Sequence, residues 1–251
     1  MKKLFAVLVV LSSVVGVASA EQFSLTTGFD YTTGKYGNAV ATDILYIPVT
    51  GKYESGKLML RLTVPYIRIT GPDYVTLNGR FTPTTASTTR TTHSGLGDVI
   101  AAAGYTFYSA GALELEALGK IKFGTADAAQ GLGTGKDDYA GQLDAYYTLG
   151  RTMLFGTAGY KIYGTPVAGI DLTNAPYYTL GVTRKFDDMD KAGMMLTELR
   201  SNSIYVGYQK EAILFYAHKF TPRAKLFMHL SKGLTDSSPA RGLGATMTGY
   251  F

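Results

Sequence analysis

The hydrophobic pattern of the chain alternates with a period of two. In residues 112–123, one parity is apolar, and the other carries the charged residues Glu114, Glu116, Lys120 and Lys122. This alternation is typical of a β-strand whose two faces meet different surroundings. Spacing typical of an amphipathic helix does not extend over any long segment, so the pattern predicts an all-β protein.

The same alternation recurs in about twelve segments, which we predict to be strands: 22–33, 41–52, 57–70, 95–108, 112–125, 138–149, 152–163, 176–187, 191–200, 210–220, 223–233 and 241–251. Short turns at 53–56, 109–111, 150–151, 188–190 and 221–222 alternate with longer connections. Short turns on one side and longer loops on the other, with an even strand number, are typical of bacterial outer-membrane barrels. The sequence therefore predicts a transmembrane antiparallel up-and-down β-barrel of about twelve strands in contact with outer-membrane lipid.

The last predicted strand, 241–251, has a second pattern that is common in outer-membrane barrels. Leu243, Ala245, Met247 and the terminal Phe251 share one parity. Pairing of this strand with the first would remove the open sheet edges that lipid cannot satisfy. An aromatic end after alternating apolar positions is also common in outer-membrane barrels, so we expect Phe251 to be recognised by the barrel-assembly machinery.

The first twenty residues have the pattern of a secretory signal peptide. A basic start is followed by an apolar run over residues 4–11 and by Ala18, Ser19 and Ala20, an A-x-A cleavage pattern. We expect residues 1–20 to be removed and residues 21–251 to form one barrel domain, located in the bacterial outer membrane.

Composition narrows the chemistry. The 251 residues contain no Cys and no Trp, and 17% are charged. The absence of Cys excludes a disulfide scaffold and a thiolate metal site. The formal charge of +5 falls to +3 when Lys2 and Lys3 are removed with the signal peptide, which is too small to indicate a nucleic-acid partner. We expect a monomer.

Catalytic motifs are not evident. His93, His218 and His229 have no metal-ligand spacing, and the glycine-rich segment 131–136 is followed by Asp137 instead of the Ser or Thr of a phosphate-binding loop. We expect no cofactor, no metal and no enzymatic activity. An outer-membrane enzyme is a distant third alternative.

The parity of the predicted strands directs one set of charges into the lumen. Lys or Arg facing lipid near the bilayer centre would cost roughly 2–4 kcal/mol, so these charges are expected to face inward. They can form an ion-paired network that braces the wall, or a polar lining that selects what passes. The candidates are Asp30, Arg61, Asp98, Glu114, Glu116, Lys120, Lys122, Asp144, Lys161 and Lys185.

The longest predicted loop covers residues 71–94. It is rich in Thr and contains Arg80, Arg90 and His93, which we treat as candidate gate residues. Loops of this length are commonly functional. This loop can fold into the lumen as a constriction or extend into the medium.

Four segments carry a family resemblance: SGLGD at 94–98, KIKFGTAD at 120–127, GLGTGKDD at 131–138 and KGLTDSSP at 232–239. In order and spacing, and in the final Tyr250 and Phe251, the chain resembles the outer-membrane transporter family named for meta-pathway phenol degradation. The resemblance implies a barrel that moves small, often aromatic or apolar solutes. It singles out Asp98 as a family-motif charge entering the lumen below the long loop.

These observations favour a channel for passive passage of small organic solutes. Twelve strands lie between the filled eight-stranded barrels and the wide sixteen-stranded porins, so the lumen is expected to be narrow. The main alternative is a structural or surface-adhesive barrel whose lumen is plugged by residues 71–94.

Overall fold

The computed structural model describes residues 21–36, 40–72, 76–77, 80–81, 89–164, 173–200 and 207–251. The predicted signal peptide, residues 1–20, lies outside the described residues. Within the described ranges, no helix is long and apolar enough to cross a membrane.

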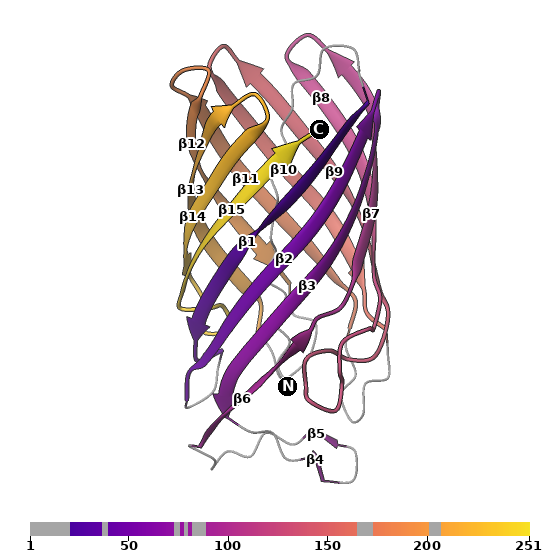
Figure 1. Cartoon of the computed structure of the whole chain (residues 1–251), viewed down its shortest axis with the longest axis vertical. Helices are drawn as coiled ribbons and strands as arrows, with labels where there is room; N and C mark the ends of the chain where they lie inside the picture. The colour runs from indigo at the N-terminus through magenta and orange to yellow at the C-terminus, as the bar shows by residue number, and fades with distance from the viewer. Residues whose placement is uncertain are drawn as a thin grey trace.

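The described chain is built of antiparallel strands (Figure 1). They are β1 (Gln22–Gly34), β2 (Thr42–Ser55), β3 (Leu58–Pro72), β4 (Thr76–Leu77), β5 (Arg80–Phe81), β6 (Arg90–Leu96), β7 (Ile100–Ala110), β8 (Leu113–Lys122), β9 (Asp138–Leu149), β10 (Thr152–Ile162), β11 (Ala175–Lys185), β12 (Asp190–Leu199), β13 (Gln209–Thr221), β14 (Ala224–Gly233) and β15 (Arg241–Tyr250).

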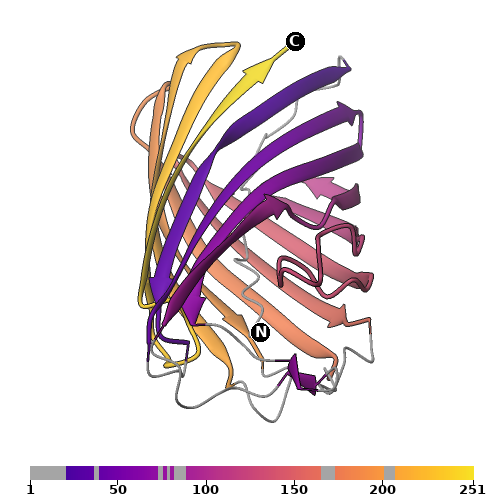
Figure 2. The same ribbon diagram turned by 60° about the horizontal axis from the view of Figure 1, so that its bottom comes forward.

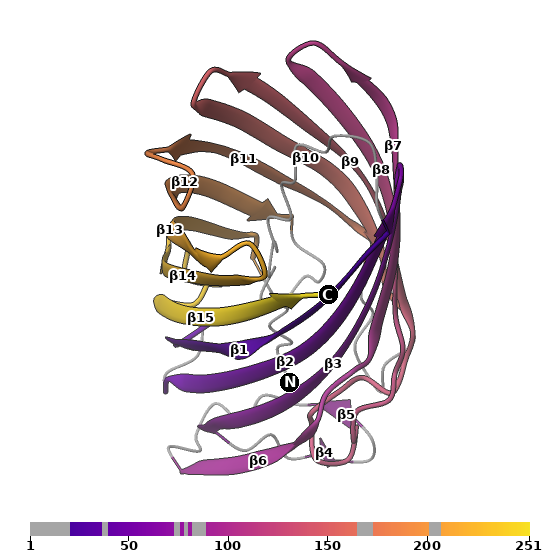
Figure 3. The same ribbon diagram turned by 45° about the horizontal axis from the view of Figure 1, so that its top comes forward.

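The strands close into a barrel. β1 pairs with β2 on one side and with β15 on the other, and Ser24 lies opposite Tyr250. β2 also pairs with β3, so the sheet has no free end at this seam. β6 and β7 share one place in the wall beside β3, and β4 and β5 form a separate two-residue hairpin. The predicted closed barrel of twelve strands is confirmed, and Figure 3 shows the wall curving around a central space.

One predicted strand is interrupted. The segment expected at 95–108 is two strands: β6 pairs with one half of β3, from Tyr66 onward, and β7 pairs with the other half. Residues 97–99 leave the ladder between them, although the Gly97 amide still donates to the Pro65 carbonyl at 2.8 Å. The predicted loop 71–94 is correspondingly shorter, because β3 continues to Pro72 and β6 begins at Arg90.

The hairpin turns lie at one end of the barrel, with the start of β1 and the end of β15 (Figure 1, top). Gly56, Gly111 and Gly150 in these turns each have a φ of 58°. Glycine adopts this left-handed conformation without the steric cost that a Cβ imposes. We call this the short-turn end. The longer connections lie at the opposite end, seen from below in Figure 2 and called the long-loop end.

The two faces of the wall differ in polarity. On β3, Leu60 and Leu62 are 44% and 51% exposed, whereas the alternate residues Met59 and Thr63 are buried. The same division continues around the barrel, with exposed aromatic residues such as Tyr105 and Tyr178 on the outer face. The outer surface is therefore an apolar belt suited to lipid, and the polar parity faces inward.

Replacing Leu180 tests this assignment. Leu180 is 69% exposed near the middle of β11, so Leu180→Arg should destabilise the barrel in lipid by roughly 2–4 kcal/mol. The measurement is the urea midpoint of the folded form on a gel without boiling. Leu180→Ala is the control, because it removes apolar area without adding charge. Equal midpoints for the two variants would contradict an outward, lipid-facing position.

Candidate functional site

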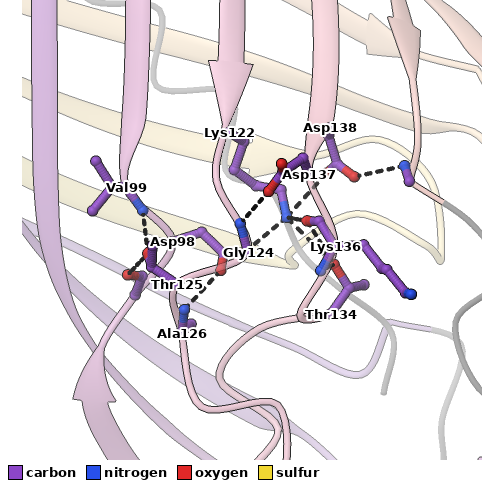
Figure 4. A network of polar contacts seen from close by, with 12 residues as sticks. Asp98, Val99, Lys122, Gly124, Thr125, Ala126, Thr134, Lys136, Asp137 and Asp138 are labelled. Carbon is purple, nitrogen blue, oxygen red and sulfur yellow. Dashed lines mark hydrogen bonds and ion pairs between the residues drawn. The ribbon is translucent and has the colours of Figure 1, made fainter.

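The barrel interior is the candidate site, and a network of buried polar contacts lies at its long-loop end (Figure 4). Lys122 Nζ lies 2.8 Å from Asp98 Oδ2 and 3.3 Å from Asp138 Oδ2. Lys161 Nζ lies 3.4 Å from the same Asp138 oxygen. The side chains of Asp98, Lys122 and Asp138 are 8%, 5% and 2% exposed. We call these four residues the lock cluster.

The lock cluster joins three strands to one loop. Lys122 ends β8, Asp138 begins β9 and Lys161 lies near the end of β10. Lys122 Nζ also donates to the Lys136 carbonyl at 2.9 Å, within the loop of residues 123–137. Alternating charges with hydrogen-bond partners lower the cost of burying ions, and this arrangement ties the loop to the wall.

Backbone contacts extend this attachment to the break between β6 and β7. Asp98 Oδ1 accepts a hydrogen bond from the Ala126 amide at 3.0 Å. Thr125 Oγ1 accepts from the Val99 amide at 2.9 Å and lies 3.3 Å from the Gly97 carbonyl, to which it donates. The interruption at 97–99 thus supplies the groups that hold loop 123–137.

The loop covers the inner side of β6. Leu96 is 65% exposed on the outer face, so its neighbour Gly95 faces inward. A Cβ on Gly95 would come within 2.9 Å of Leu132 Cδ1, and Leu132 is buried. Loop 123–137 therefore lies inside the mouth of the barrel. This was one of the two positions that the sequence suggested for residues 71–94, of which 73–75, 78–79 and 82–88 lie outside the described residues.

The three gate candidates lie elsewhere. Arg90 begins β6, forms an ion pair with Asp43 and donates to the Thr70 carbonyl at 3.1 Å, so it braces the rim of the wall. His93 is an exposed residue of β6. Arg80 lies in β5, and its side chain is outside the described part of the structure.

A second polar group lies deeper in the lumen. Asp144 on β9 accepts hydrogen bonds from Thr157 Oγ1 at 2.5 Å and from Gln142 Nε2 at 2.6 Å. Tyr177 donates to Gln142 Oε1 at 2.9 Å, and Lys120 Nζ lies 5.6 Å from the centre of the Tyr177 ring. These contacts form a continuous polar surface across β8 to β11.

The remaining lumen candidates are spread over the wall. Asp30 Oδ2 lies 2.9 Å from His229 Nε2, across the intervening Gly244, which has no side chain to obstruct the contact. Arg61, Glu114 and Glu116 lie on the inward parity of β3 and β8. Lys185 lies at the short-turn end, with its side chain 54% exposed and 3.5 Å from Asp188.

An apolar cluster inside the barrel was missed by the sequence analysis. It consists of the buried residues Phe155, Met195, Ile213 and Phe215, packed against Tyr146, Met153 and Phe227. Glycines on the neighbouring strands could have indicated this cluster, because they leave room for its aromatic rings. A Cβ on Gly181 would come within 2.2 Å of Phe155 Cζ, and a Cβ on Gly193 would come within 2.4 Å of Phe215 Cζ. We call this the apolar lumen cluster.

The short-turn end contains a cavity of about 410 Å³. Its lining includes Arg61, Met153 and Ala217, together with Lys52, Lys185, Lys191, Lys219 and Lys225. The two ends of the interior therefore differ: buried ion pairs hold a loop at one end, and lysines line a cavity at the other.

No group of three or more His, Asp or Glu residues within the described ranges is placed to hold a metal ion. The polar and charged groups that the structure brings together instead line the interior of the wall.

Comparisons place the wall among outer-membrane barrels. No protein-family model and no curated protein matches the chain. The outer membrane channel COG4313 from Pseudomonas putida F1 is 14% identical, with 94% of this chain and 97% of that chain covered and a TM-score of 0.71. The KdgM porin is 10% identical over 91% and 99% of the two chains, with a TM-score of 0.56.

A third solved structure is the translocator domain of the autotransporter NalP from Neisseria meningitidis. It is 10% identical, with 94% of this chain and 88% of that chain covered and a TM-score of 0.52. These likenesses show a shared fold: the chain has the architecture of outer-membrane channels, porins and translocator domains.

Removing the central cation tests the lock cluster. Lys122→Met leaves the Asp98 and Asp138 carboxylates without their common partner, and such a loss at a buried pair typically costs about 3–5 kcal/mol. We expect loop 123–137 to be released and cleaved faster by proteinase K while the barrel remains folded. Cleavage sites would be identified by mass spectrometry.

Lys136→Gln is the matched control for this experiment. It removes one lysine charge from the same region, but the Lys136 side chain is exposed and only its backbone carbonyl contacts Lys122. Equal cleavage of the two variants would show that the ion pairs do not hold the loop.

Proposed function

We propose that the protein is a bacterial outer-membrane channel for the passive passage of small organic solutes. The observation that carries the proposal is the two-faced wall: an apolar belt outside, and a charged interior with a cavity inside. A channel needs an aqueous path lined by polar groups, whereas a barrel that only anchors other domains does not. The similar folds include a channel and a porin, which supports this function.

The proposal assigns the interior charges to the path. Asp30, Glu116, Lys120 and Asp144 would line the middle, and Arg61, Glu114 and Lys185 the part towards the short-turn mouth. Asp98, Lys122 and Lys161 would act indirectly, because they belong to the lock cluster, which holds loop 123–137 at the long-loop mouth. The loop would narrow the path and limit the size of the solute.

The resemblance to the phenol-degradation transporter family supports aromatic or apolar organic compounds as solutes. We further propose that the chain acts as a monomer, without cofactor, and that residues 1–20 direct export and are removed. Phe251 lies against Phe23 with ring centres 6.0 Å apart and is 76% exposed, so it is available to the barrel-assembly machinery during insertion.

A structural barrel with a plugged lumen is the second candidate. It is favoured by the lock cluster, because buried ion pairs hold loop 123–137 at the long-loop end. The two candidates differ in whether any solute crosses the folded protein.

Flux into proteoliposomes separates them. A small aromatic acid and a sugar of similar size should both enter faster than into protein-free liposomes, with the aromatic acid faster after leakage is subtracted. Lys122→Met should increase both rates because the loop at the mouth is released, and Lys136→Gln should leave them unchanged. If neither solute entered above leakage, even in the Lys122→Met variant, the structural barrel would be the better explanation.

A further inference from the structure

Four lysines lie on neighbouring strands at the short-turn end. They are Lys185 on β11, Lys191 on β12, Lys219 on β13 and Lys225 on β14, and we call them the lysine belt. Lys185 lies directly opposite Lys191, and Lys219 lies directly opposite Lys225. Like charges at directly opposed positions destabilise a sheet. All four belong to the inward parity and line the cavity of about 410 Å³.

The acidic residues around this cavity are engaged in the turn between β11 and β12. Asp187 accepts hydrogen bonds from the Met189 and Asp190 amides at 2.8 and 2.7 Å. Asp188 lies 3.5 Å from Lys185, and Asp190 pairs with His218 at 2.7 Å. On the opposite wall, Lys52 pairs with Glu54 at 2.7 Å. Basic side chains outnumber acidic ones in the lining of the cavity, so positive charge is in excess there: Lys52, Arg61, Arg151 and the lysine belt lie against Asp187, Asp188 and Asp190.

The apolar lumen cluster borders the lysine belt. Phe227 is two residues from Lys225 and shares its face of β14, and Ala217 lies between Phe215 and Lys219 on β13. Met153 packs against the apolar lumen cluster and also lines the cavity. A row of ammonium groups thus adjoins an apolar wall inside one cavity.

We propose that this cavity binds small organic anions with an apolar body, such as aromatic monocarboxylates, and makes the channel selective for them. This inference rests on the proposed channel function and specifies its substrate class. The carboxylate lies among the ammonium groups of the lysine belt, where the positive potential attracts it. The apolar body lies against Met153 and Ala217, which line the cavity, and its burial there adds affinity that a polar anion of the same charge lacks.

Ion selectivity in planar bilayers tests the lysine belt. Under a potassium chloride gradient the wild-type reversal potential should indicate preference for the anion. Lys219→Gln and Lys225→Gln should each lower the anion-to-cation permeability ratio by up to about sevenfold, because one unit charge acting through water over roughly 7 Å changes the anion and the cation about threefold each, in opposite directions. The double variant should lower it further.

Lys232→Gln is the matched control, because Lys232 is also on β14 but is exposed on the outer face near the long-loop end. It should keep the wild-type ratio. Conductance without anion preference, unchanged by the belt substitutions, would overturn the inference while leaving the channel function intact. Absence of conductance in folded, reconstituted protein would instead contradict the channel itself.

The apolar wall is tested by comparing benzoate with gluconate, which carries the same charge on a polar body. Wild type should be more permeable to benzoate, and Met153→Gln should reduce the benzoate-to-gluconate ratio towards one without changing the preference for chloride over potassium. Met228→Gln is the control, since Met228 is exposed on the outer face of β14. An unchanged ratio in Met153→Gln would remove the apolar wall from the proposed site.

Discussion

The closure of β1 onto β15 is the constraint on which the rest of the structure depends. A strand surrounded by apolar material has no water to satisfy its backbone amides and carbonyls, so an open sheet edge facing lipid is costly. The continuous register from Ser24 opposite Tyr250 to Thr33 opposite Arg241 supplies the last pair of neighbours. Once the wall is closed, alternation along each strand decides which side chains face outward, and every charged residue on the other parity must be accommodated inside.

The lock cluster is the clearest response to that requirement. Burying Lys122 and Asp138 at the ends of adjacent strands would be costly for either alone, and their mutual contact with Asp98 offsets the desolvation. Asp98 reaches this position because the chain leaves the β-ladder between β6 and β7. The segments that resemble the phenol-degradation transporter family, 94–98, 120–127 and 131–138, meet at this cluster. These three segments are separate in the sequence but contact one another in the folded protein.

The features that could be predicted from the sequence are those that depend on alternation within one strand. The twelve-stranded wall, the glycine turns and the inward parity of β8 follow from local patterns. The loop inside the mouth could not be identified in this way, because the contact between Leu132 and Gly95 joins residues far apart in the chain. The apolar lumen cluster was hidden for another reason. In this part of β12 and β13 the residues on both faces are apolar, as Met194 and Met195 show. The alternation therefore could not indicate which face points into the lumen.

The two ends of the interior use charge in opposite ways, and this contrast bears on function. At the long-loop end, Lys122 lies between two carboxylates and is shielded from solvent. At the short-turn end, Lys219 faces Lys225 across the ladder and both line a cavity. A purely structural barrel would be more stable with an acidic residue at one position of each opposed pair. Lysine at both positions lowers the stability of the sheet and gives the cavity a positive potential. Such a potential serves a protein that receives anions from solution, which favours the channel over the plugged barrel.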